Sequence, residues 1–369
     1  MKNQIKNSVF IWLLISQISY GQNKTQKIDS LLNVLSQSQK INGNILVAEK
    51  GKVIYSKSFG LSNEETKEKI NQNTIFELAS CSKQFTAMGI VILKEKGKLN
   101  LEDKITKFLP ELSKYSNISI KNLLHHTAGL PDYMAVMDSI WDKTQIANNQ
   151  DMINIFSKYQ PKVLFEPNTK HEYSNTGYAL LATIIEKASG LSYSDFLTKN
   201  IFKPLKMKNS FVYNRRLSPK KIQNYALGYV YIKSQNKLIL PDDFEKTKMV
   251  FWLDGVVGDG TVNSTVVDLL KWDRALYSTK LVSSESLKEI FSNGQLNDGS
   301  VTKHGYGWRV LEMNGIGKIA KHSGAWPGYM SYIERNVETD KTIIILQNHS
   351  NVTMPSDEIR NILYNKEKK

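Results

Sequence analysis

The sequence predicts an α+β fold in which one antiparallel sheet is assembled from both ends of the chain and a mainly helical lobe is inserted between them. Strand patterns occur near the start and again near the end, whereas helical spacing of apolar residues dominates the middle. With 369 residues, of which 41% are hydrophobic, the chain holds enough apolar material for one large domain or two packed halves. We therefore expect an α/β lobe at 22–78 and 285–369, a helical lobe at 79–284, and a cleft between them.

The first residues of the chain differ in composition from the rest. Lys2 and Lys6 precede the apolar run Val9 to Ile15, and more polar residues and Gly21 follow it. This run is shorter than the ~20 residues that a membrane-spanning helix needs, so the pattern predicts a cleaved signal peptide over residues 1–21. The expected protein is exported, to the periplasm or beyond, and an uncleaved N-terminal anchor is the alternative.

Charge and cysteine content narrow the class of partner. The formal net charge is +14, but the lysines are spread along the chain without a recognised nucleic-acid motif, so we expect no nucleic-acid partner. No further apolar run reaches the ~18 residues of a membrane span, so no integral membrane domain is expected. Cys81 is the only cysteine, which excludes an internal disulfide and makes a lipid attachment at the leader unexpected.

The first predicted elements are a helix and a hairpin. Apolar residues recur at helical spacing from Lys27 to Gln37. Two short apolar runs, Ile45 to Ala48 and Val53 to Tyr55, are joined by Glu49-Lys50-Gly51-Lys52. This pattern predicts a β-hairpin that belongs to the sheet lobe.

Helices dominate the middle of the chain, and strands return at its end. A helix is predicted from Ser82 to Lys96, with Gly97 as its C-terminal stop. Further helices are predicted at Ile120–His126, Thr176–Ala188, Ser194–Ile201, Ser264–Leu276 and Ser284–Phe291. Strands are predicted at Tyr306–Leu311, Lys318–Lys321, Tyr329–Arg335 and Thr342–Gln347, with turns at Asn314-Gly315 and Glu338–Lys341. The polar stretch Leu217–Lys237 is expected to be a loop.

Ser80 and Lys83 are the first residues with a chemical use. They form an S-x-x-K pattern, and if Ser80 starts the predicted helix, the spacing places both side chains on one face. A serine hydroxyl is a poor nucleophile until a base takes its proton, and a partly buried lysine can do this because burial disfavours the ammonium form. The same pattern occurs at Ser218 and Ser234, but there it lies in polar loop sequence.

The triplet Tyr173-Ser174-Asn175 supplies a phenol and an amide just before a predicted helix. The tyrosine could share the proton with Lys83, and the asparagine could orient a substrate amide. Tyr115-Ser116-Asn117 repeats the same letters without a long apolar helix behind it. Helix capping is the alternative function of such a triplet.

His322-Ser323-Gly324 follows the predicted strand Lys318–Lys321. The glycine would let a substrate approach the backbone closely, and the imidazole can hydrogen-bond a carboxylate or assist proton transfer. A surface imidazole is the alternative. The adjacent His125 and His126 face different ways on a helix, and an H-E-x-x-H motif or a Cys/His cluster is absent, so no metal is expected.

Taken in order, Ser80-Cys81-Ser82-Lys83, Tyr173-Ser174-Asn175 and His322-Ser323-Gly324 resemble the three active-site elements of the serine β-lactamase and penicillin-binding protein-like family. That family contains class C β-lactamases, D-alanyl-D-alanine carboxypeptidases and related esterases. The flanking segments that match are Phe76–Ala79, Leu123–Pro131, Gly177-Tyr178, Ser264–Leu276, Tyr306–Trp308 and Gly328-Tyr329. The resemblance covers residues 30–350 and implies a β-lactamase/transpeptidase-like fold, in agreement with the predicted elements.

The resemblance also implies roles for individual residues. Ser80 would attack a carbonyl while Lys83 and Tyr173 manage its proton. Substrate contacts are implied for Asn175, His322, Ser323 and Gly324. The backbone N–H groups of Ser80 and Ala325 would hold the oxyanion, an acyl-enzyme would form, and water would release it without a cofactor.

His322 stands where β-lactamases of this family usually present lysine. A neutral imidazole attracts a carboxylate less than an ammonium does, so efficient β-lactam hydrolysis is not favoured. The expected activity is hydrolysis of D-amino-acid peptides or small amides and esters, as by a D-alanyl-D-alanine carboxypeptidase, with peptidoglycan-derived peptides among the candidate substrates. A class C-like β-lactamase or an esterase is the alternative enzyme. A catalytically silent ligand-binding protein is the alternative from another class, and the presence of Ser80 and Lys83 favours the enzyme.

Overall fold

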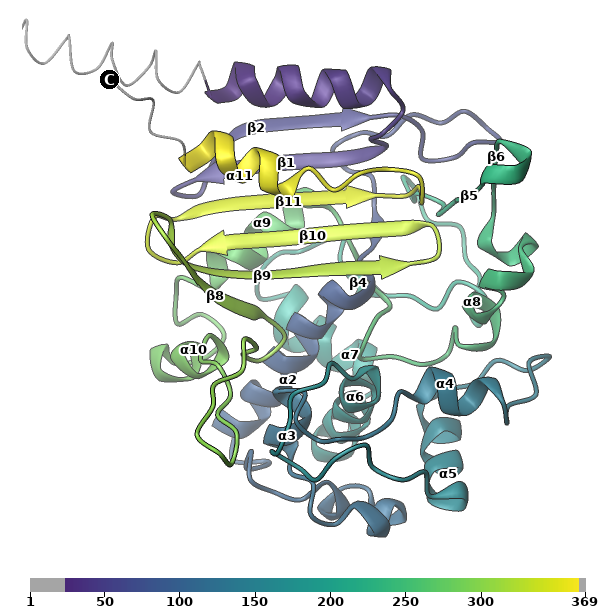
Figure 1. The fold of residues 1–369 in the computed structure, drawn as a ribbon, viewed down its shortest axis with the longest axis vertical. Coiled ribbons are helices and arrows are strands. Elements are labelled where there is room, and N and C mark those ends of the chain that lie inside the picture. Colours follow the sequence, from purple (N-terminus) through teal and green to yellow (C-terminus); the bar gives the residue numbers. More distant parts are fainter. Residues whose placement is uncertain (1–23, 365–369) are drawn as a thin grey trace, which may run out of the picture.

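The two ends of the chain meet in one six-stranded sheet (Figure 1). The computed structural model describes residues 24–364, so the predicted signal peptide at 1–21 lies outside the described residues. The strand order is β2-β1-β11-β10-β9-β8, and all neighbours are antiparallel. Strand β1 from the start of the chain pairs with β11 from its end. This sheet and the helices beside it confirm the predicted α+β fold class.

The strands lie close to their predicted positions. They are β1 (Gly43–Glu49), β2 (Lys52–Phe59), β8 (Arg309–Met313), β9 (Gly317–Trp326), β10 (Tyr329–Asn336) and β11 (Lys341–Gln347). The predicted early hairpin is formed by β1 and β2. Strand β9 extends well beyond its predicted end at Lys321, so His322-Ser323-Gly324 lies inside the strand rather than after it.

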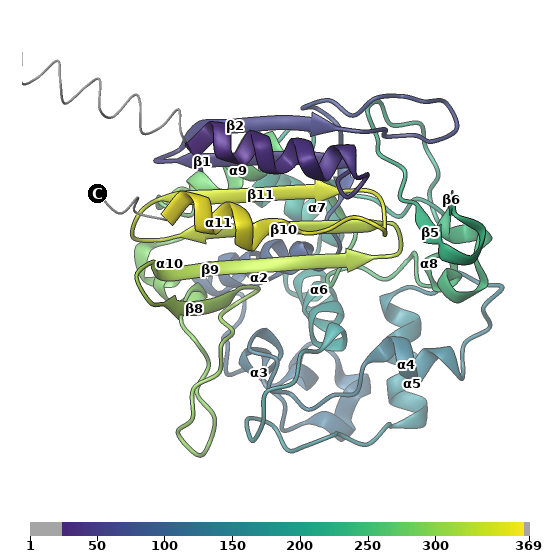
Figure 2. The ribbon, with the colours of Figure 1, turned by 45° about the horizontal axis from the view of Figure 1, so that its top comes forward.

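Both faces of the sheet are buried. In β1, Ile45 and Val47 belong to one hydrophobic cluster and Leu46 and Ala48 to another, because side chains alternate across a strand. The helix at residues 24–37, purple in Figure 2, and α11 (Ser356–Tyr364) cover the first face. Helix α9 (Val266–Ala275) packs against β1 and β11 on the opposite face, where the helical lobe begins.

The helical lobe is built around α6, which packs against four other helices of the lobe. Its helices are α2 (Lys83–Glu95), α3 (Ile120–Leu124), α4 (Tyr133–Asp138), α5 (Asn149–Tyr159), α6 (Asn175–Ser189), α7 (Tyr193–Leu197), α8 (Met249–Trp252) and α10 (Ser284–Ile290). Contacts of α6 reach α2, α3, α5 and α7. Among residues 24–364, no helix is both long enough and apolar enough to cross a membrane.

Several elements differ from the prediction. The predicted helix from Ser264 begins at Val266, because Ser264 ends the short strand β7 (Val262–Ser264) and the Thr265 side chain caps the helix by accepting from the N–H of Asp268. Four helices, α4, α5, α8 and α11, were not predicted. The short strands β3 (Phe76–Glu77) and β4 (Phe211–Val212) pair with β7, while β5 (Val230–Ile232) pairs with β6 (Lys237–Ile239).

The region 217–237 was expected to be a loop, yet it contains β5. Within β5 itself, Val230 and Ile232 are buried and Tyr231 between them is partly exposed. An alternation over so few residues is too short to be separated from irregular polar sequence. The strand forms because β6 pairs with it, and this pairing is a tertiary contact.

A buried ion pair joins the helical lobe to the sheet. Asp273 of α9 accepts a hydrogen bond from Nε of Arg335 in β10 at 2.9 Å, and both side chains are fully buried. Asp273 also accepts from the Thr342 hydroxyl at 2.9 Å, and the Tyr277 ring lies 4.0 Å from the Arg335 guanidinium. Because a charge buried without a partner is costly, this pair constrains how α9 docks on the sheet.

We predict that Asp273→Ala lowers the free energy of unfolding by about 3–5 kcal/mol, because Arg335 would remain as an uncompensated buried charge. Chemical denaturation at pH 7 measures this loss. Asp340→Ala is the matched control, since Asp340 pairs with Arg274 closer to the surface, and its expected cost is about 1 kcal/mol or less. Equal losses in the two variants would contradict the special position of Asp273.

Candidate active site

Ser80 lies in a short 3-10 turn that leads into helix α2. The turn spans Ala79–Ser82 and α2 begins at Lys83, so Ser80 precedes the α-helix instead of starting it. Because residues i and i+3 are eclipsed in a 3-10 turn, Lys83 Nζ still lies 3.2 Å from Ser80 Oγ. Ala79 has a φ of 46°, a left-handed conformation that strains a non-glycine residue by on the order of 1–3 kcal/mol. The surrounding structure must therefore hold the nucleophile turn in place.

Lys83 is fully buried, and three acceptors surround its amine. Nζ donates to Ser80 Oγ at 3.2 Å, to Asn175 Oδ1 at 2.9 Å and to the backbone oxygen of Asp259 at 2.8 Å. The ring centroids of Tyr173 and Tyr178 lie 5.0 and 5.7 Å from Nζ. A buried ammonium is costly unless every proton has a partner, and here the three protons match three oxygens.

The same contacts also suit the neutral amine that proton abstraction requires. Two N–H groups of a neutral lysine can donate to the carbonyl oxygens of Asn175 and Asp259, neither of which can donate in return. The lone pair can then accept from the hydroxyl of Ser80, which is able to reverse its role. The geometry thus lets Ser80 pass a proton to Lys83 without moving a heavy atom.

Asn175 is held in the orientation that Lys83 needs. Its Nδ2 donates to Asp132 Oδ2 at 2.9 Å, which leaves Oδ1 for the lysine. Asp132 is itself held as the N-cap of α4, where its other oxygen accepts from the N–H of Met134 at 2.8 Å. The chain Met134–Asp132–Asn175–Lys83 therefore fixes the amide against a flip.

Tyr173 lies at the edge of this group. Its ring faces Lys83 and packs on His126, with ring centroids 4.5 Å apart, and 38% of the residue is exposed. Among the described residues, the Tyr173 hydroxyl makes no hydrogen bond to Ser80 or Lys83. Its role in proton transfer stays a prediction.

His126 packs against the ring of Tyr173, a role that the sequence did not reveal. The ring is buried between Tyr173 and Tyr178, and its Nδ1 accepts from the backbone N–H of Ser174 at 3.1 Å. Burial pushes the pKa of His126 well below its ordinary value, so the ring is neutral. His126 therefore positions the segment that carries Tyr173, through ring packing and through the hydrogen bond to Ser174.

His322 is also buried and neutral. Its Nδ1 lies 2.7 Å from the carbonyl oxygen of Ser323, which can only accept, so Nδ1 carries the ring proton. Burial, helped by the charge of Lys83, lowers the pKa of His322 to about 4. The remaining nitrogen, Nε2, is then an acceptor. A ring in this state offers no donor to a substrate carboxylate, contrary to the role suggested by the sequence.

Strand β9 brings the His-Ser-Gly segment against the nucleophile turn. β8 pairs with β9 only as far as Lys321, so the edge of β9 from His322 to Trp326 has no strand beside it within residues 24–364. A Cβ at Gly324 would overlap the carbonyl oxygen of Leu78 and lie 3.0 Å from the backbone nitrogen of Ser80. The glycine is therefore required by the nucleophile's own backbone, whereas the sequence suggested room for a substrate.

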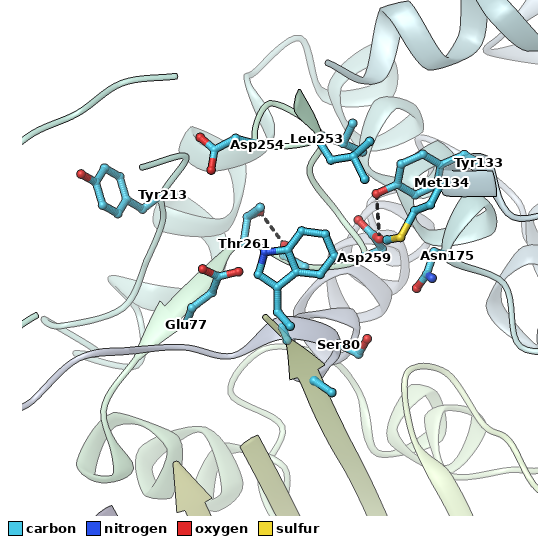
Figure 3. A pocket seen from close by; sticks show the side chains of 15 residues that line it. Glu77, Ser80, Tyr133, Met134, Asn175, Tyr213, Leu253, Asp254, Asp259 and Thr261 are labelled. Carbon is cyan, nitrogen blue, oxygen red and sulfur yellow. Dashed lines mark hydrogen bonds between the residues drawn. The ribbon is translucent and has the colours of Figure 1, made fainter. Parts of the chain in front are cut away.

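Ser80 borders a cavity of about 160 Å³ (Figure 3). Asn175 and Ala325 line the same cavity, and Lys83 lies behind it, in contact with the lining residues Ser80, Asn175 and Asp259. A substrate carbonyl held there would reach both the hydroxyl and the open edge of β9. The oxyanion hole predicted at the N–H groups of Ser80 and Ala325 is compatible with this placement and stays a prediction.

Asp259 and Asp132 are further site residues that sequence reasoning missed. The Asp259 carboxyl accepts from the Tyr133 hydroxyl at 3.2 Å, and burial raises its pKa against the opposing charge of Lys83. Asp259 reaches Lys83 through its backbone, which no side-chain pattern can reveal. Asp132 directly follows the family-like segment Leu123–Pro131, and that was the available signal.

The remaining histidines and the cysteine take no catalytic position. Within the described residues, no group of three or more His, Cys, Asp or Glu side chains is arranged to hold a metal ion. Cys81 is buried, and its Sγ lies 3.4 Å from the carbonyl oxygen of His322. Burial raises the pKa of the Cys81 thiol to about 12, so this residue is an inert part of the packing.

The chain is similar to known proteins over most of its length. A family model described as Beta-lactamase matches residues 28–365. Penicillin-binding protein 4* of Bacillus subtilis (strain 168) is 45% identical over 327 residues, which are 89% of this chain and 72% of that protein. The octameric penicillin-binding protein homologue from Pyrococcus abyssi matches with a TM-score of 0.76 and 27% identity, over 92% of this chain and 76% of that one. D-amino acid amidase from Ochrobactrum anthropi SV3, complexed with D-phenylalanine, matches with a TM-score of 0.73 and 25% identity, over 94% and 98% of the two chains.

We predict that Asp132→Asn lowers kcat/KM for a p-nitrophenyl ester by roughly 10- to 100-fold. The new amide can still cap α4 with its oxygen, but its NH2 group would then face Nδ2 of Asn175. Asn175 must flip to avoid two opposed donors, and it would present an N–H to Lys83. Asp138→Asn, an exposed change on the same helix, should leave kcat/KM unchanged. Equal activity in both variants would mean that the orientation of Asn175 does not position Lys83.

We also predict that acidification from pH 6.5 to 5 lowers the free energy of unfolding. Burial lowers the pKa of His125 and His322 to about 4 and that of His304 to about 3, and it holds His126 lower than its ordinary value as well. Below about pH 6.5 these histidines take up protons in the unfolded chain but not in the folded protein. Each of them therefore lowers the free energy of unfolding by up to about 1.4 kcal/mol per pH unit in this window. Burial raises the pKa of Glu77 to about 7 and also raises the pKa of Asp259, and these two carboxyl groups act in the opposite direction.

Urea denaturation at several pH values measures this dependence. His304→Phe removes one of the titrating rings while filling a similar volume, so its unfolding free energy should fall less steeply between pH 6.5 and 5. The difference in slope should approach one proton. A wild-type protein equally stable at pH 6.5 and 5 would refute the neutral state of the buried rings.

Proposed function

Because this chain belongs to the Beta-lactamase family of serine hydrolases, we propose that it hydrolyses D-amino-acid amides, small peptides or esters through an acyl-enzyme on Ser80. The observation that carries the proposal is the contact of 3.2 Å between Ser80 Oγ and the amine of the fully buried Lys83. A serine needs a base within hydrogen-bond reach to attack a carbonyl at neutral pH. Among residues 24–364, Ser80 has the only side-chain hydroxyl that is hydrogen-bonded to the Lys83 amine.

In the proposed reaction, Ser80 Oγ attacks the substrate carbonyl carbon as its proton passes to the neutral amine of Lys83. The negative oxygen of the tetrahedral intermediate lies against the N–H groups of Ser80 and Ala325. The C–N or C–O bond to the leaving group then breaks, and the leaving group takes the proton from Lys83 by way of Tyr173. Water then attacks the carbonyl carbon of the acyl-enzyme, and its proton passes by way of Tyr173 and Lys83 to Ser80 Oγ. This step releases the acid and restores the free Ser80 hydroxyl.

The substrate class rests on two observations. A D-amino acid amidase resembles this chain over 94% of its length, which supports D-amino-acid amides. Neutral His322 offers no fixed positive charge to a β-lactam or C-terminal carboxylate, which disfavours both the β-lactamase alternative and the carboxypeptidase-like activity expected from the sequence. Small peptides from the cell wall remain within the proposed class. An exported location, expected from the pattern at residues 1–21, is part of the proposal.

We predict that wild-type protein hydrolyses D-phenylalanine p-nitroanilide and gains the mass of a fluorescent penicillin, whereas Ser80→Ala does neither. Loss of the nucleophile should lower kcat by roughly 10³-fold or more. Ser218→Ala is the matched control, since Ser218 and Lys221 repeat the same spacing away from the cavity. Intact-mass spectrometry and release of p-nitroaniline are the readouts.

Either of two results would overturn the proposal. The first is a covalent adduct on Ser80→Ala equal to that on the wild type. The second is a folded wild-type protein that neither turns over any amide or ester nor acquires an adduct, as expected of a silent ligand-binding protein.

A further inference from the structure

The cavity beside Ser80 is acidic. Of the 15 residues that line it, Glu77, Asp254 and Asp259 carry carboxyl groups, and none is a lysine or an arginine. Figure 3 shows Glu77 and Asp254 on one side of the cavity, with Ser80 and Asn175 on the other. A substrate whose carbonyl meets Ser80 therefore extends past two carboxyl groups.

Asp254 has protein partners. Its Oδ1 accepts from Arg216 Nη1 at 3.1 Å, and its Oδ2 accepts from the backbone nitrogens of Arg216 and Leu217 at 2.7 and 2.9 Å. Arg216 carries the positive charge that balances it. Asp254 is therefore a structural carboxylate that holds the loop at Arg216.

Glu77 has no such partner. Within residues 24–364, its carboxyl makes neither a hydrogen bond nor an ion pair, although it lines the cavity and is only partly exposed. Burial raises the pKa of Glu77 to about 7, and the charge of Arg216 opposes that shift without a direct contact. A carboxyl group that is shielded from water without a hydrogen-bond donor costs folding free energy. Its position in the cavity therefore points to a donor that a ligand supplies.

The backbone around Glu77 places it close to the chemistry. Glu77 ends strand β3, which pairs with β7, and the nucleophile turn begins two residues later at Ala79. The three residues from Glu77 to Ser80 can span at most about 11 Å between Cα atoms. A carboxyl and a nucleophile so close together can contact the same small substrate.

A substrate carboxylate would be repelled by this arrangement. It would meet Glu77, Asp254 and Asp259, and the neutral ring of His322 offers Nε2 only as an acceptor. An ammonium group has the opposite fit, since it brings both the charge and the donors that Glu77 lacks.

We propose that Glu77 binds a primary ammonium group of the substrate, so that the enzyme selects amides or esters that carry a free amine. This inference rests on the proposed function and narrows its substrate class. The ammonium is either the α-amine of a D-amino acid or the amine of a longer side chain. Glu77 is then a specificity residue. The enzyme prefers amides or esters that carry a free amine to substrates that carry a free carboxylate next to the bond that is cleaved.

Two matched pairs of substrates test the proposal. D-phenylalanine p-nitroanilide and its N-acetyl form differ in the α-amine, and Nα-acetyl-D-lysine p-nitroanilide and its Nε-acetyl form differ in the side-chain amine. For at least one pair, wild-type kcat/KM should be tenfold or more higher with the free amine. Glu77→Gln should reduce that preference at least tenfold, and the pair that responds identifies which amine is bound.

The control variant is Glu245→Gln, which removes an exposed carboxylate paired with Lys248 and raises the formal net charge by one, as Glu77→Gln does. It should keep the full preference. Glu77→Asp retains the charge and should keep part of the preference, which separates the loss of a carboxylate from a change in folding. Circular dichroism and the melting temperature verify that each variant is folded.

A binding experiment separates this inference from the proposed function. Calorimetry of Ser80→Ala with D-phenylalaninamide and with Nα-acetyl-D-lysinamide measures ammonium binding without turnover. Adding Glu77→Gln should weaken the binding of at least one ligand tenfold or more, even if the wild type hydrolyses nothing. Wild-type preferences near one for both pairs, or preferences and affinities that survive Glu77→Gln in a folded protein, would overturn the inference while leaving acylation of Ser80 intact.

Discussion

The site depends on the burial of Lys83. Its amine has no exposure to water, and its partners come from three separate segments: the turn that carries Ser80, the start of α6 at Asn175 and the backbone at Asp259. An ion removed from water costs several kcal/mol unless its partners are well placed. A shift of any one segment would therefore leave one proton of the Lys83 amine without an acceptor. The packing that buries Lys83 and the chemistry that uses it thus depend on the same contacts.

The sheet supplies the second half of this arrangement. Ser331 of β10 donates to the carbonyl oxygen of Leu78 at 2.6 Å, and Gly324 of β9 leaves room for the backbone of the same turn. These contacts hold the strained conformation of Ala79, which precedes the nucleophile. The buried pair of Asp273 and Arg335 then fixes the helical lobe against the sheet. The reactive hydroxyl is thus positioned by both lobes, although it belongs to neither sheet nor α-helix.

Charge is distributed unevenly around the nucleophile. On one side lies Lys83, surrounded by oxygen acceptors, and His322 beside it is neutral because burial and the lysine charge both disfavour its protonation. On the other side lies the unpaired carboxyl of Glu77. A cavity lined by hydrogen-bond acceptors and carboxyl groups suits a substrate that donates hydrogen bonds and carries a positive charge. Similarity of fold alone would not have distinguished a cavity that binds an ammonium group from one that binds a carboxylate.

The sequence by itself determined the α+β class, most strands and helices, and the contact of Ser80 with Lys83, because these depend on local periodicity and on spacing along one turn of helix. It did not reveal α4, α5 or β5, whose apolar patterns are short and become stable only against other elements. The tertiary structure alone decided the roles of Asp132, His126 and Asp259. The Asp132 carboxylate holds an amide, the His126 ring packs on a tyrosine, and Asp259 acts through its backbone oxygen, and none of these contacts produces a sequence motif. It also decided that Gly324 makes room for the nucleophile's own backbone and that Glu77 faces the cavity unpaired, because steric fit and charge balance arise only when distant segments come together.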